Sequence, residues 1–410
     1  MVTKSFAKEE FVAVHPLSHT VLRFIILRFC TQMSVQMLAV AVGYEIYEIT
    51  RSPLWLGLSG LVQFFPRVLF MLPSGQAADR YDRRRLGAFT QFGVSICATI
   101  LLITSLTHTV TAILMLVIVF SYGTAFAFQG PALVSLLPNL VSKEDFPKAT
   151  ARVSSMQQAA IIVGPAVAGF LYIAGAYVVY SLILVFNVTS IVLVLSLRRE
   201  HIKRTEFKNA PESPLAGLRY IRKNKGLFGA ITLDMFAVLF SGVTALLPIF
   251  AEEVLHSGPV GFGFMRAAPA VGALIMAGYL SFRPVLHRTG KVMFAAVGAY
   301  GLFTIAFAFS TNIILSVVFL IVLGLVDQVS VVIRSTYTQV VTTDDVRGRV
   351  TAVNFVFIGA SNQLGEFESG VVASLIGTVP AVIFGGVCTL AIVAIWYKAF
   401  PVLSNLDKIE

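Results

Sequence analysis

GQAADRYDRRRLG, residues Gly75 to Gly87, places four arginines and two aspartates between two long apolar runs. Across all 410 residues, 57% of the side chains are hydrophobic and only 13% are charged. A soluble domain carries roughly 25% charged residues. Each run beside the quoted stretch is long enough to cross a hydrocarbon layer of roughly 30 Å as an α-helix. The sequence therefore predicts an integral membrane protein of the all-α class.

Apolar runs of similar length recur along the whole chain. We expect twelve transmembrane helices. The expected spans cover residues 19–47, 53–76, 86–107, 110–139, 147–174, 177–197, 226–254, 260–282, 291–309, 312–340, 350–377 and 379–400.

The distribution of lysine and arginine predicts the orientation in the membrane. Most of these 31 residues fall in the N-terminal tail, in the loops after even-numbered spans and in the C-terminal tail, whereas the opposite loops hold only Arg51. Short loops rich in lysine and arginine stay in the cytoplasm, so both termini are expected to be cytoplasmic. We expect a monomeric, multi-pass protein of a bacterial cytoplasmic (inner) membrane. The net charge of +10 then reflects topology, and no nucleic-acid partner is expected.

Motifs for enzymatic chemistry are absent from the sequence. There is no HExxH, no GxSxG and no phosphate-binding glycine loop, and the six histidines are scattered. Cys30, Cys97 and Cys388 lie in three separate apolar spans. We expect no enzyme activity, no cofactor, no metal site and no disulfide framework.

The longest hydrophilic stretch divides the chain into two similar halves. We expect an N-terminal six-helix bundle over residues 1–197, a cytoplasmic linker over 198–225 and a C-terminal six-helix bundle over 226–410. VSKEDF from Val141 resembles VTTDDV from Val341, and Gly169 falls opposite Gly370. Parallel repeats of this kind occur in transporters whose substrate site lies between the two halves. Within the linker, SPLAGLRYIRK is either a short amphipathic helix on the membrane surface or a solvated connector.

The opening stretch resembles the signature loop of the major facilitator superfamily. Asp82 stands where the family's second glycine is usual. The resemblance implies a gating loop that holds the two halves together by charge-assisted hydrogen bonds. The alternative is a loop that only anchors the topology. The residues of the pattern are Gly75, Asp79, Arg80, Arg83 and Arg84.

A second resemblance, in AIIVGPAVAG, is to the antiporter motif of the same superfamily. Gly164, Pro165 and Gly169 match, and Ala160 and Ala168 replace two glycines by another small residue. Small residues let helix backbones approach closely, and a proline bends the helix. The family motif implies export, and ordinary helix packing is the alternative.

Phrases in the second half resemble bacterial exporters related to the enterobactin exporter, also called transmembrane secretion effectors. These phrases are LLPIFAEEVL, GLVDQVSVVIRSTYTQ, DDVRGRV and SNQLGEFESG. The resemblance implies a proton-coupled antiporter that exports a small amphipathic compound such as a siderophore or a drug. The alternatives are an importer or uniporter of a small organic solute, and a lysophospholipid flippase of the same fold.

Charges inside membrane spans are costly and are therefore candidates for function. The resemblance implies that spans one, four, seven and ten line the cavity. Asp327 lies seven residues before Arg334 in span ten, on nearly the same face and about 10 Å away along the axis. Asp327 either titrates during transport or makes a permanent ionised contact. Glu252 and Glu253 are expected to be solvated near the outer exit. The candidates for the substrate and proton pathway are Arg28, Arg67, Asp234, Asp327, Arg334, Asn362 and Glu366.

The candidate arginines predict the charge of the cargo. If Arg28, Arg67 and Arg334 face the pathway, the site is cationic and suits an anionic or phenolate-bearing compound. Asp234 is either a second proton carrier or a cap near the cytoplasmic end. Glu366 lies one helical turn from Asn362, so the two are expected to share a face.

Overall fold

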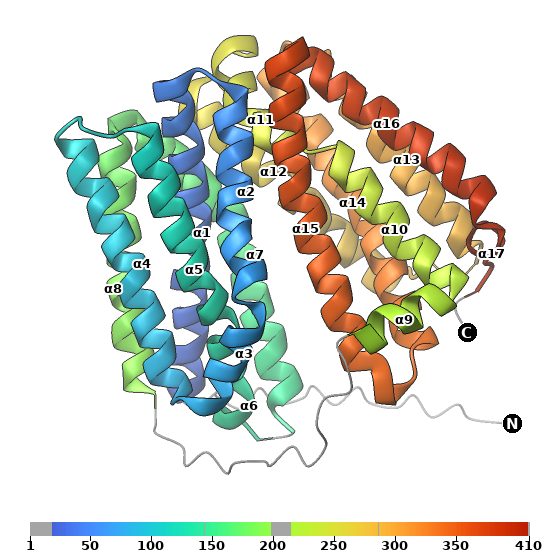
Figure 1. Cartoon of the computed structure of the whole chain (residues 1–410), viewed down its shortest axis with the longest axis horizontal. Coiled ribbons are helices and arrows are strands. Elements are labelled where there is room, and N and C mark those ends of the chain that lie inside the picture. Colours follow the sequence, from blue (N-terminus) through green and yellow to red (C-terminus); the bar gives the residue numbers. More distant parts are fainter. Residues whose placement is uncertain (1–18, 143, 198–214, 286, 409–410) are drawn as a thin grey trace, which may run out of the picture.

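The computed structural model describes residues 19–142, 144–197, 215–285 and 287–408, without the side chains of residues 72, 79, 215, 216, 344 and 345. Within these ranges the regular structure is entirely helical. Two groups of helices pack side by side (Figure 1). We call α1 to α8 the first bundle and α10 to α16 the second bundle.

The first bundle is made of eight helices and one short 3-10 turn. Pro53 at the start of α2 supplies a fixed φ where no backbone donor is needed. Helix α2 ends at Leu69, shortly after Pro66. Phe70 lies between the two helices, and α3 begins at Met71. The elements are α1 (His19–Thr50), α2 (Pro53–Leu69), α3 (Met71–Arg80), α4 (Arg83–Leu106), α5 (Ala112–Val134), α6 (Leu137–Leu140), α7 (Phe146–Leu171), η1 (Tyr172–Ala174) and α8 (Ala176–Ser196).

The second bundle follows the nine-residue helix α9 (Leu215–Lys223). The first span of this bundle is divided into α10 and α11. Gly242 directly precedes α11, and the Cα of Gly242 lies against the backbone of Gly365. The elements are α10 (Lys225–Phe240), α11 (Val243–Ile249), the π-helical turn η2 (Phe250–Val254), α12 (Gly258–Phe282), α13 (Thr289–Ala308), α14 (Ile313–Val341), α15 (Asp344–Ile376), α16 (Thr378–Ala399) and α17 (Pro401–Ser404).

Ten of the described helical segments are long and apolar enough to cross a membrane. The two expected spans that fall outside this set are 53–76 and 350–377. The first is interrupted, because α2 ends at Leu69 after 17 residues. The second lies in α15, which is 33 residues long and carries acidic and basic side chains, including Glu366 and Glu368. Ten of the described segments therefore qualify as spans by length and composition, and the count of twelve stays a prediction.

The two bundles meet closely at one end of the molecule, which we call the Thr50 end. A Cβ on Gly370 of α15 would lie 2.8 Å from the Cα of Gly57 in α2. A Cβ on Gly169 of α7 would lie 2.9 Å from the Cα of Gly263 in α12. The glycines allow these two helix pairs to cross at backbone contact. At the opposite end, which we call the Ser196 end, Figure 1 shows the two groups of helices diverging.

The last helix of each bundle begins in the same way. Gly175 precedes α8 with a φ of 116°, and Gly377 precedes α16 with a φ of 94°. Only glycine adopts such backbone angles without strain. The two turns are one more correspondence between the first and second halves.

Candidate functional site: a cavity between the bundles

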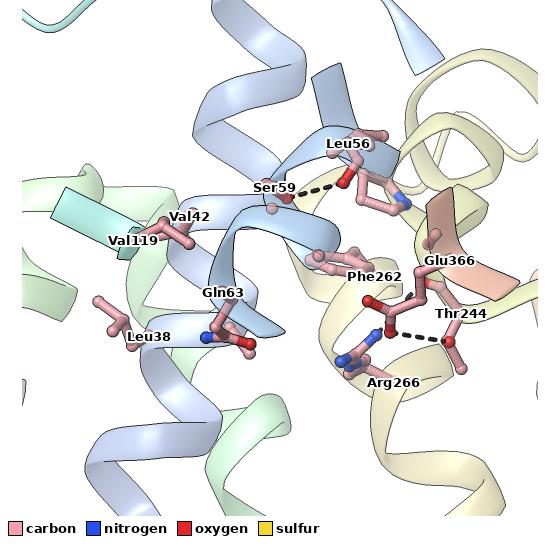
Figure 2. A pocket seen from close by; sticks show the side chains of 15 residues that line it. Leu38, Val42, Leu56, Ser59, Gln63, Val119, Thr244, Phe262, Arg266 and Glu366 are labelled. Carbon is pink, nitrogen blue, oxygen red and sulfur yellow. Dashed lines mark hydrogen bonds between the residues drawn. The ribbon is translucent and has the colours of Figure 1, made fainter. Parts of the chain in front are cut away.

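A cavity lies between the bundles, next to the close helix crossings at the Thr50 end. It holds about 600 Å³ of empty space, part of it open to solvent. Figure 2 shows residues of the first bundle on one side and residues of the second bundle on the other. The lining residues are Leu38, Ala39, Val42, Gly43, Leu56, Ser59, Gly60, Gln63, Val119, Thr244, Ala245, Pro248, Phe262, Arg266 and Glu366.

The lining differs from the expected set of helices. Helices α1, α5 and α11 belong to expected spans one, four and seven, and they contribute as expected. Helices α2, α12 and α15 also contribute, whereas no lining residue comes from α14, the expected span ten. The extra helices reach the cavity because they cross near it at Gly57, Gly263 and Gly370.

Glu366 and Arg266 give the cavity one acidic and one basic group. The Thr244 hydroxyl donates to Glu366 at 3.5 Å, and the Arg266 guanidinium donates to the Thr244 carbonyl oxygen at 3.3 Å. A Cβ at Gly60 would lie 2.6 Å from Oε2 of Glu366, so the glycine makes room for the carboxylate. Within the described chain, Glu366 has no ion pair within 4.0 Å. Both charged groups are therefore available to a ligand.

The remaining α15 candidate lies elsewhere. Asn362 is exposed, and its side-chain amide donates to the Ile358 carbonyl oxygen at 2.9 Å. It is not among the residues that line the cavity. Asn362 lies one helical turn from Glu366, as predicted, but only Glu366 lines the cavity.

The three arginines expected to make the pathway cationic are not among the described lining residues. Arg67 is half-buried, with its guanidinium 4.5 Å from the centre of the Phe126 ring, a cation–π distance. Arg28 is half-buried in α1, and within the described residues it has no hydrogen bond or ion pair. Arg334 is neutralised within the second bundle, as described next. Arg266 is the arginine that lines this cavity.

A group of three charges lies inside the second bundle, and Asp327 is its half-buried member. Arg334 of α14 pairs with Asp234 of α10 at 3.0 Å, and both side chains are buried. Asp327, on α14, interacts electrostatically with both partners but has no ion pair within 4.0 Å in the described chain. Two acids therefore share one arginine, and Asp327 is the acid without a direct partner.

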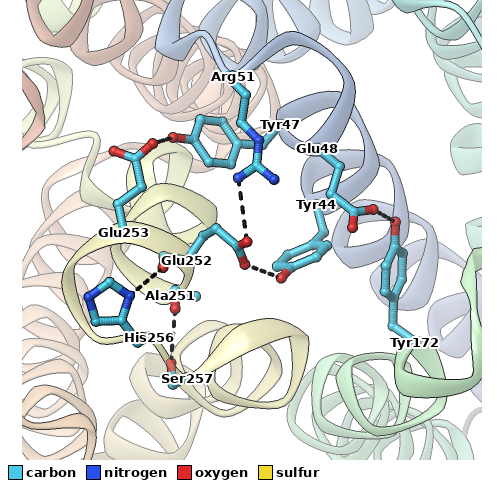
Figure 3. Close-up of polar contacts among 10 residues, drawn as sticks. All are labelled: Tyr44, Tyr47, Glu48, Arg51, Tyr172, Ala251, Glu252, Glu253, His256 and Ser257. Atoms are coloured by element: carbon cyan, nitrogen blue, oxygen red, sulfur yellow. Dashed lines mark hydrogen bonds and ion pairs between the residues drawn. The ribbon is translucent and has the colours of Figure 1, made fainter.

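Polar contacts across the bundle boundary close the Thr50 end (Figure 3). The Tyr44 hydroxyl donates to Glu252 at 2.5 Å, and the Tyr47 hydroxyl donates to Glu253. Arg51 forms an ion pair with Glu252 at 3.4 Å. The two glutamates lie on η2. Glu253 is exposed, as expected, whereas Glu252 is half-buried, and both accept hydrogen bonds from α1.

A second pair of acids fixes the same part of α1 within its own bundle. Tyr172 donates to Glu48 at 2.7 Å, and Tyr180 donates to Glu45. Tyr172 also packs edge-on against Tyr44, with 4.9 Å between ring centres. These contacts attach the end of α1 to η1 and α8 of the same bundle.

Comparison with known proteins identifies the family. The family model of the Major Facilitator Superfamily matches residues 24–366. The chain belongs to the major facilitator superfamily. Members of this superfamily are transporters, and the chain is therefore a membrane transporter and not an enzyme.

Individual relatives are exporters by name. The enterobactin exporter EntS of Escherichia coli O139:H28 is 26% identical over 82% of this chain and 81% of its own length. Macrolide efflux protein A of Streptococcus pyogenes is 25% identical over 58% of this chain, and the match spans 60% of that relative.

The fold comparison agrees with the family. A bacterial homologue of the human lysosomal transporter Spinster, solved in an inward-facing, occupied conformation, has a TM-score of 0.75 at 13% identity. The match covers 93% of this chain and 96% of that structure. At this identity the likeness concerns the fold alone.

The loop that resembles the superfamily's signature ties helices of the first bundle together. Arg83 donates to the carbonyl oxygens of Ala78 at 3.3 Å and Ser135 at 3.1 Å, and Arg84 donates to that of Leu195 at 2.6 Å. Arg80 is exposed at the end of α3, and Gly75 in α3 has open space where a Cβ would point. The side chain of Asp79 lies outside the described residues.

Asp82, the departure from the family pattern, has a structural role of its own. Its carboxylate accepts from the backbone N–H groups of Arg84 at 2.9 Å and Arg85 at 3.3 Å. It is therefore the N-cap of α4.

The antiporter-like motif lies at the bundle boundary. Gly164 is packed against Gln36 of α1, where a Cβ would come within 2.8 Å of that side chain. The backbone atoms of Pro165 and Gly169 lie directly against Gly263 of α12. All three motif residues are buried. The motif therefore sits at a crossing between the bundles.

Sequence reasoning did not select Arg266, Tyr44 or Glu252 for the site. Arg266 was detectable, because it is a charge inside a predicted span. Tyr44 gave no such signal, since tyrosine is common near the ends of membrane helices.

Proposed function

We propose that this transporter is a proton-coupled antiporter that exports a small amphipathic compound by alternating access. The observation that carries the proposal is the cavity lined by both bundles and closed at the Thr50 end. Such a cavity can be exposed to either side of a membrane if the bundles rotate about it. The Thr50 end is then extracellular and the Ser196 end cytoplasmic, as the distribution of lysine and arginine indicates.

The proposed topology has twelve spans, and both termini lie in the cytoplasm. In this proposal the protein lies in a bacterial inner membrane, with bundles over 1–197 and 226–410 and a linker between them. The fold needs no partner chain, and we expect a monomer. The gating loop, including Arg80, Arg83 and Arg84, would reach the second bundle only when the Ser196 end closes.

Proton coupling is assigned to the charges of the second bundle. A carboxylate that is half-buried inside a helix bundle without a direct partner is costly when it is ionised, and taking up a proton removes that cost. Asp327 is therefore the proposed proton carrier, and Asp234 with Arg334 forms the ion pair that responds to it. These three charges lie apart from the cavity lining, so coupling acts through movement of α14 and α10.

Export and the class of cargo rest on the relatives and the lining. Both relatives named above are exporters, one of a siderophore and one of macrolides. The cavity lining combines apolar and polar side chains, and its two charged groups, Glu366 and Arg266, can orient an amphipathic molecule. Arg266 takes the role of anion-binding group that the sequence suggested for Arg28, Arg67 and Arg334.

A flux experiment tests the proposal. Purified protein in proteoliposomes is loaded with enterobactin or erythromycin, and efflux is measured with and without a proton gradient. We expect the gradient to accelerate efflux of at least one compound. Asp327→Asn should abolish this acceleration while leaving ligand binding intact, and Asp407→Asn, outside the spans, is the matched control. If the efflux rates of both compounds are the same with and without the proton gradient, proton coupling is refuted.

A second comparison tests the cavity. Arg266→Gln should weaken binding of the anionic siderophore more than binding of the macrolide. Equal losses for the two compounds would point to structural damage and remove Arg266 from recognition.

A further inference from the structure

Helix α9 has two faces of opposite character. Gly217 and Ile221 are buried, and the Tyr220 hydroxyl donates to the Val341 carbonyl oxygen at 2.7 Å. Arg219, Arg222 and Lys223 are exposed. Positions separated by three and four residues lie on one face of a helix, so the three cations form a single exposed stripe.

The cationic stripe has no counter-charge in the described protein. Within the described residues, Arg219, Arg222 and Lys223 make no ion pair and no hydrogen bond. Like charges at these spacings repel one another and destabilise a helix slightly. An anion bound to the stripe would offset this repulsion.

The position of α9 places the stripe at the membrane surface. Asn224 alone separates α9 from α10, which begins the apolar segment Lys225–Val254. The Asn224 side chain accepts from the Leu227 N–H at 3.0 Å, so a capped helix start fixes the angle between the two helices. Figure 1 shows α9 lying across the ends of α10 and α15. Its exposed face is therefore at the level of lipid headgroups.

The surface next to the stripe suits an amphiphile. A shallow hollow is lined by the three cations together with Leu218. The cations match a phosphate group, and the leucine offers an apolar contact to the beginning of an acyl chain. A soluble phosphate compound would use only the cations.

We propose that the stripe Arg219–Arg222–Lys223 is a binding site for the headgroup of an acidic phospholipid. The bound lipid holds α9 at the surface. Because α9 is fixed to the end of α14 through Tyr220 and Val341, and Gly217 packs on the backbone of Arg349 in α15, the lipid also positions the Ser196 end of the second bundle. The proposal does not depend on the transported compound or on proton coupling.

Lipid titration of the full-length protein tests the site. Dioleoyl phosphatidylglycerol is titrated into the detergent-purified protein, and the bound lipid is counted by native mass spectrometry, with phosphatidylcholine as the neutral comparison. The variant R219Q/R222Q/K223Q should bind phosphatidylglycerol at least about tenfold more weakly, because each cation near an anionic surface contributes to binding. The matched control R283Q/K291Q/K398Q removes three exposed cations elsewhere in the second half and should change the affinity less than about twofold.

The other outcomes are decisive as well. Equal affinity of the α9 variant and the control variant would overturn the proposal. So would displacement of the lipid by glycerol 3-phosphate at the same concentration, which would make the ligand a soluble phosphate compound. If the triple variant does not fold, R219K/R222K keeps the charge and should keep the affinity, while Arg222→Gln alone should reduce it. Unchanged affinity in Arg222→Gln would then count against the site.

Discussion

The hydroxyl group of Tyr44 in α1 donates a 2.5 Å hydrogen bond to Glu252 of η2, across the boundary between the two bundles. Arg51, the residue directly after the end of α1, reaches the same carboxylate at 3.4 Å. Glu252 thus joins one donor and one cation of the first bundle to the second. These contacts exist only while the Thr50 end is closed, so they contribute to the equilibrium between the two states of the transporter.

Replacing Glu252 by glutamine should shift that equilibrium toward opening of the Thr50 end. A hydrogen bond to a charged group contributes about 1.5–3 kcal/mol when buried. Because Glu252 and Arg51 are partly exposed, we expect about 1 kcal/mol, which corresponds to a roughly fivefold larger open population. Spin labels at the exposed positions Leu54 and Leu375 would report the distance between the bundles.

The control for this variant is Glu48→Gln. Glu48 accepts from Tyr172 at 2.7 Å inside the first bundle and makes no described contact with the second. Its replacement should leave the distance distribution unchanged. An identical shift in both variants would mean that the effect comes from α1 itself and not from the contact with η2.

Gly370→Val should prevent closure of the Thr50 end. A Cβ at this position would lie 2.8 Å from the carbonyl oxygen of Pro53 and from the Cα of Gly57, closer than a real Cβ contact. The valine side chain would meet backbone atoms of α2, which cannot rotate away as a side chain can, so α2 and α15 must move apart. The spin-label distance should therefore increase, and transport should stop. Gly278→Val is the control, since nothing lies within 4 Å of a Cβ there. A Gly370→Val variant with a normal distance would refute this role for the crossing.

Much of the fold could be predicted from the sequence, because it depends on the length of apolar runs. The expected span 177–197 agrees closely with α8, and the expected span 379–400 with α16. The break of the second span at Phe70 was not predictable in this way, since the apolar run continues through it. The correspondence of Gly169 with Gly370 was visible in the sequence. Their shared role was not, because it depends on Gly263 and Gly57 of the opposite bundles.

The site was less predictable, because sequence spacing relates residues on one helix only. It placed Asp327 and Arg334 on one face of α14, but the partner of Arg334 is Asp234, on a helix one hundred residues earlier in the chain. A charge inside a span indicates that a partner is needed without identifying it. The cavity depends in the same way on which helices cross, and this brought Arg266 next to Thr244.

Arg334→Gln should destabilise the protein strongly, because it leaves Asp234 buried without a counter-charge. Breaking a buried ion pair from one side costs about 3–5 kcal/mol. The double variant Asp234→Asn/Arg334→Gln removes both charges and should recover part of this loss. Thermal unfolding of the single and double variants in detergent gives the coupling between the two residues. Purely additive effects would contradict a direct ion pair, and Arg288→Gln, an exposed arginine, serves as the control.

Asp407 is predicted to stabilise the junction between the C-terminal segment and α13 in a pH-dependent way. Its carboxylate accepts from the backbone N–H of Arg288 at 2.9 Å, where Arg288 has a left-handed φ of 54°, and it lies 3.5 Å from the His287 ring. The backbone N–H of Arg288 and, to a smaller extent, His287 hold the pKa of Asp407 below its ordinary value.

A group whose pKa is lowered by folding contributes stability above the pKa of the unfolded state, and the contribution is lost as the pH falls through the pKa of the folded state. Asp407→Asn should therefore lower the unfolding temperature slightly at neutral pH, and the difference from the unaltered protein should shrink below about pH 3.9, the ordinary value for aspartate. Thermal unfolding of both proteins along a pH series measures this difference, with Lys398→Gln, an exposed lysine of α16, as the control. A difference that is constant from neutral to acidic pH would show that the carboxylate charge of Asp407 is not what holds the C-terminal segment to α13.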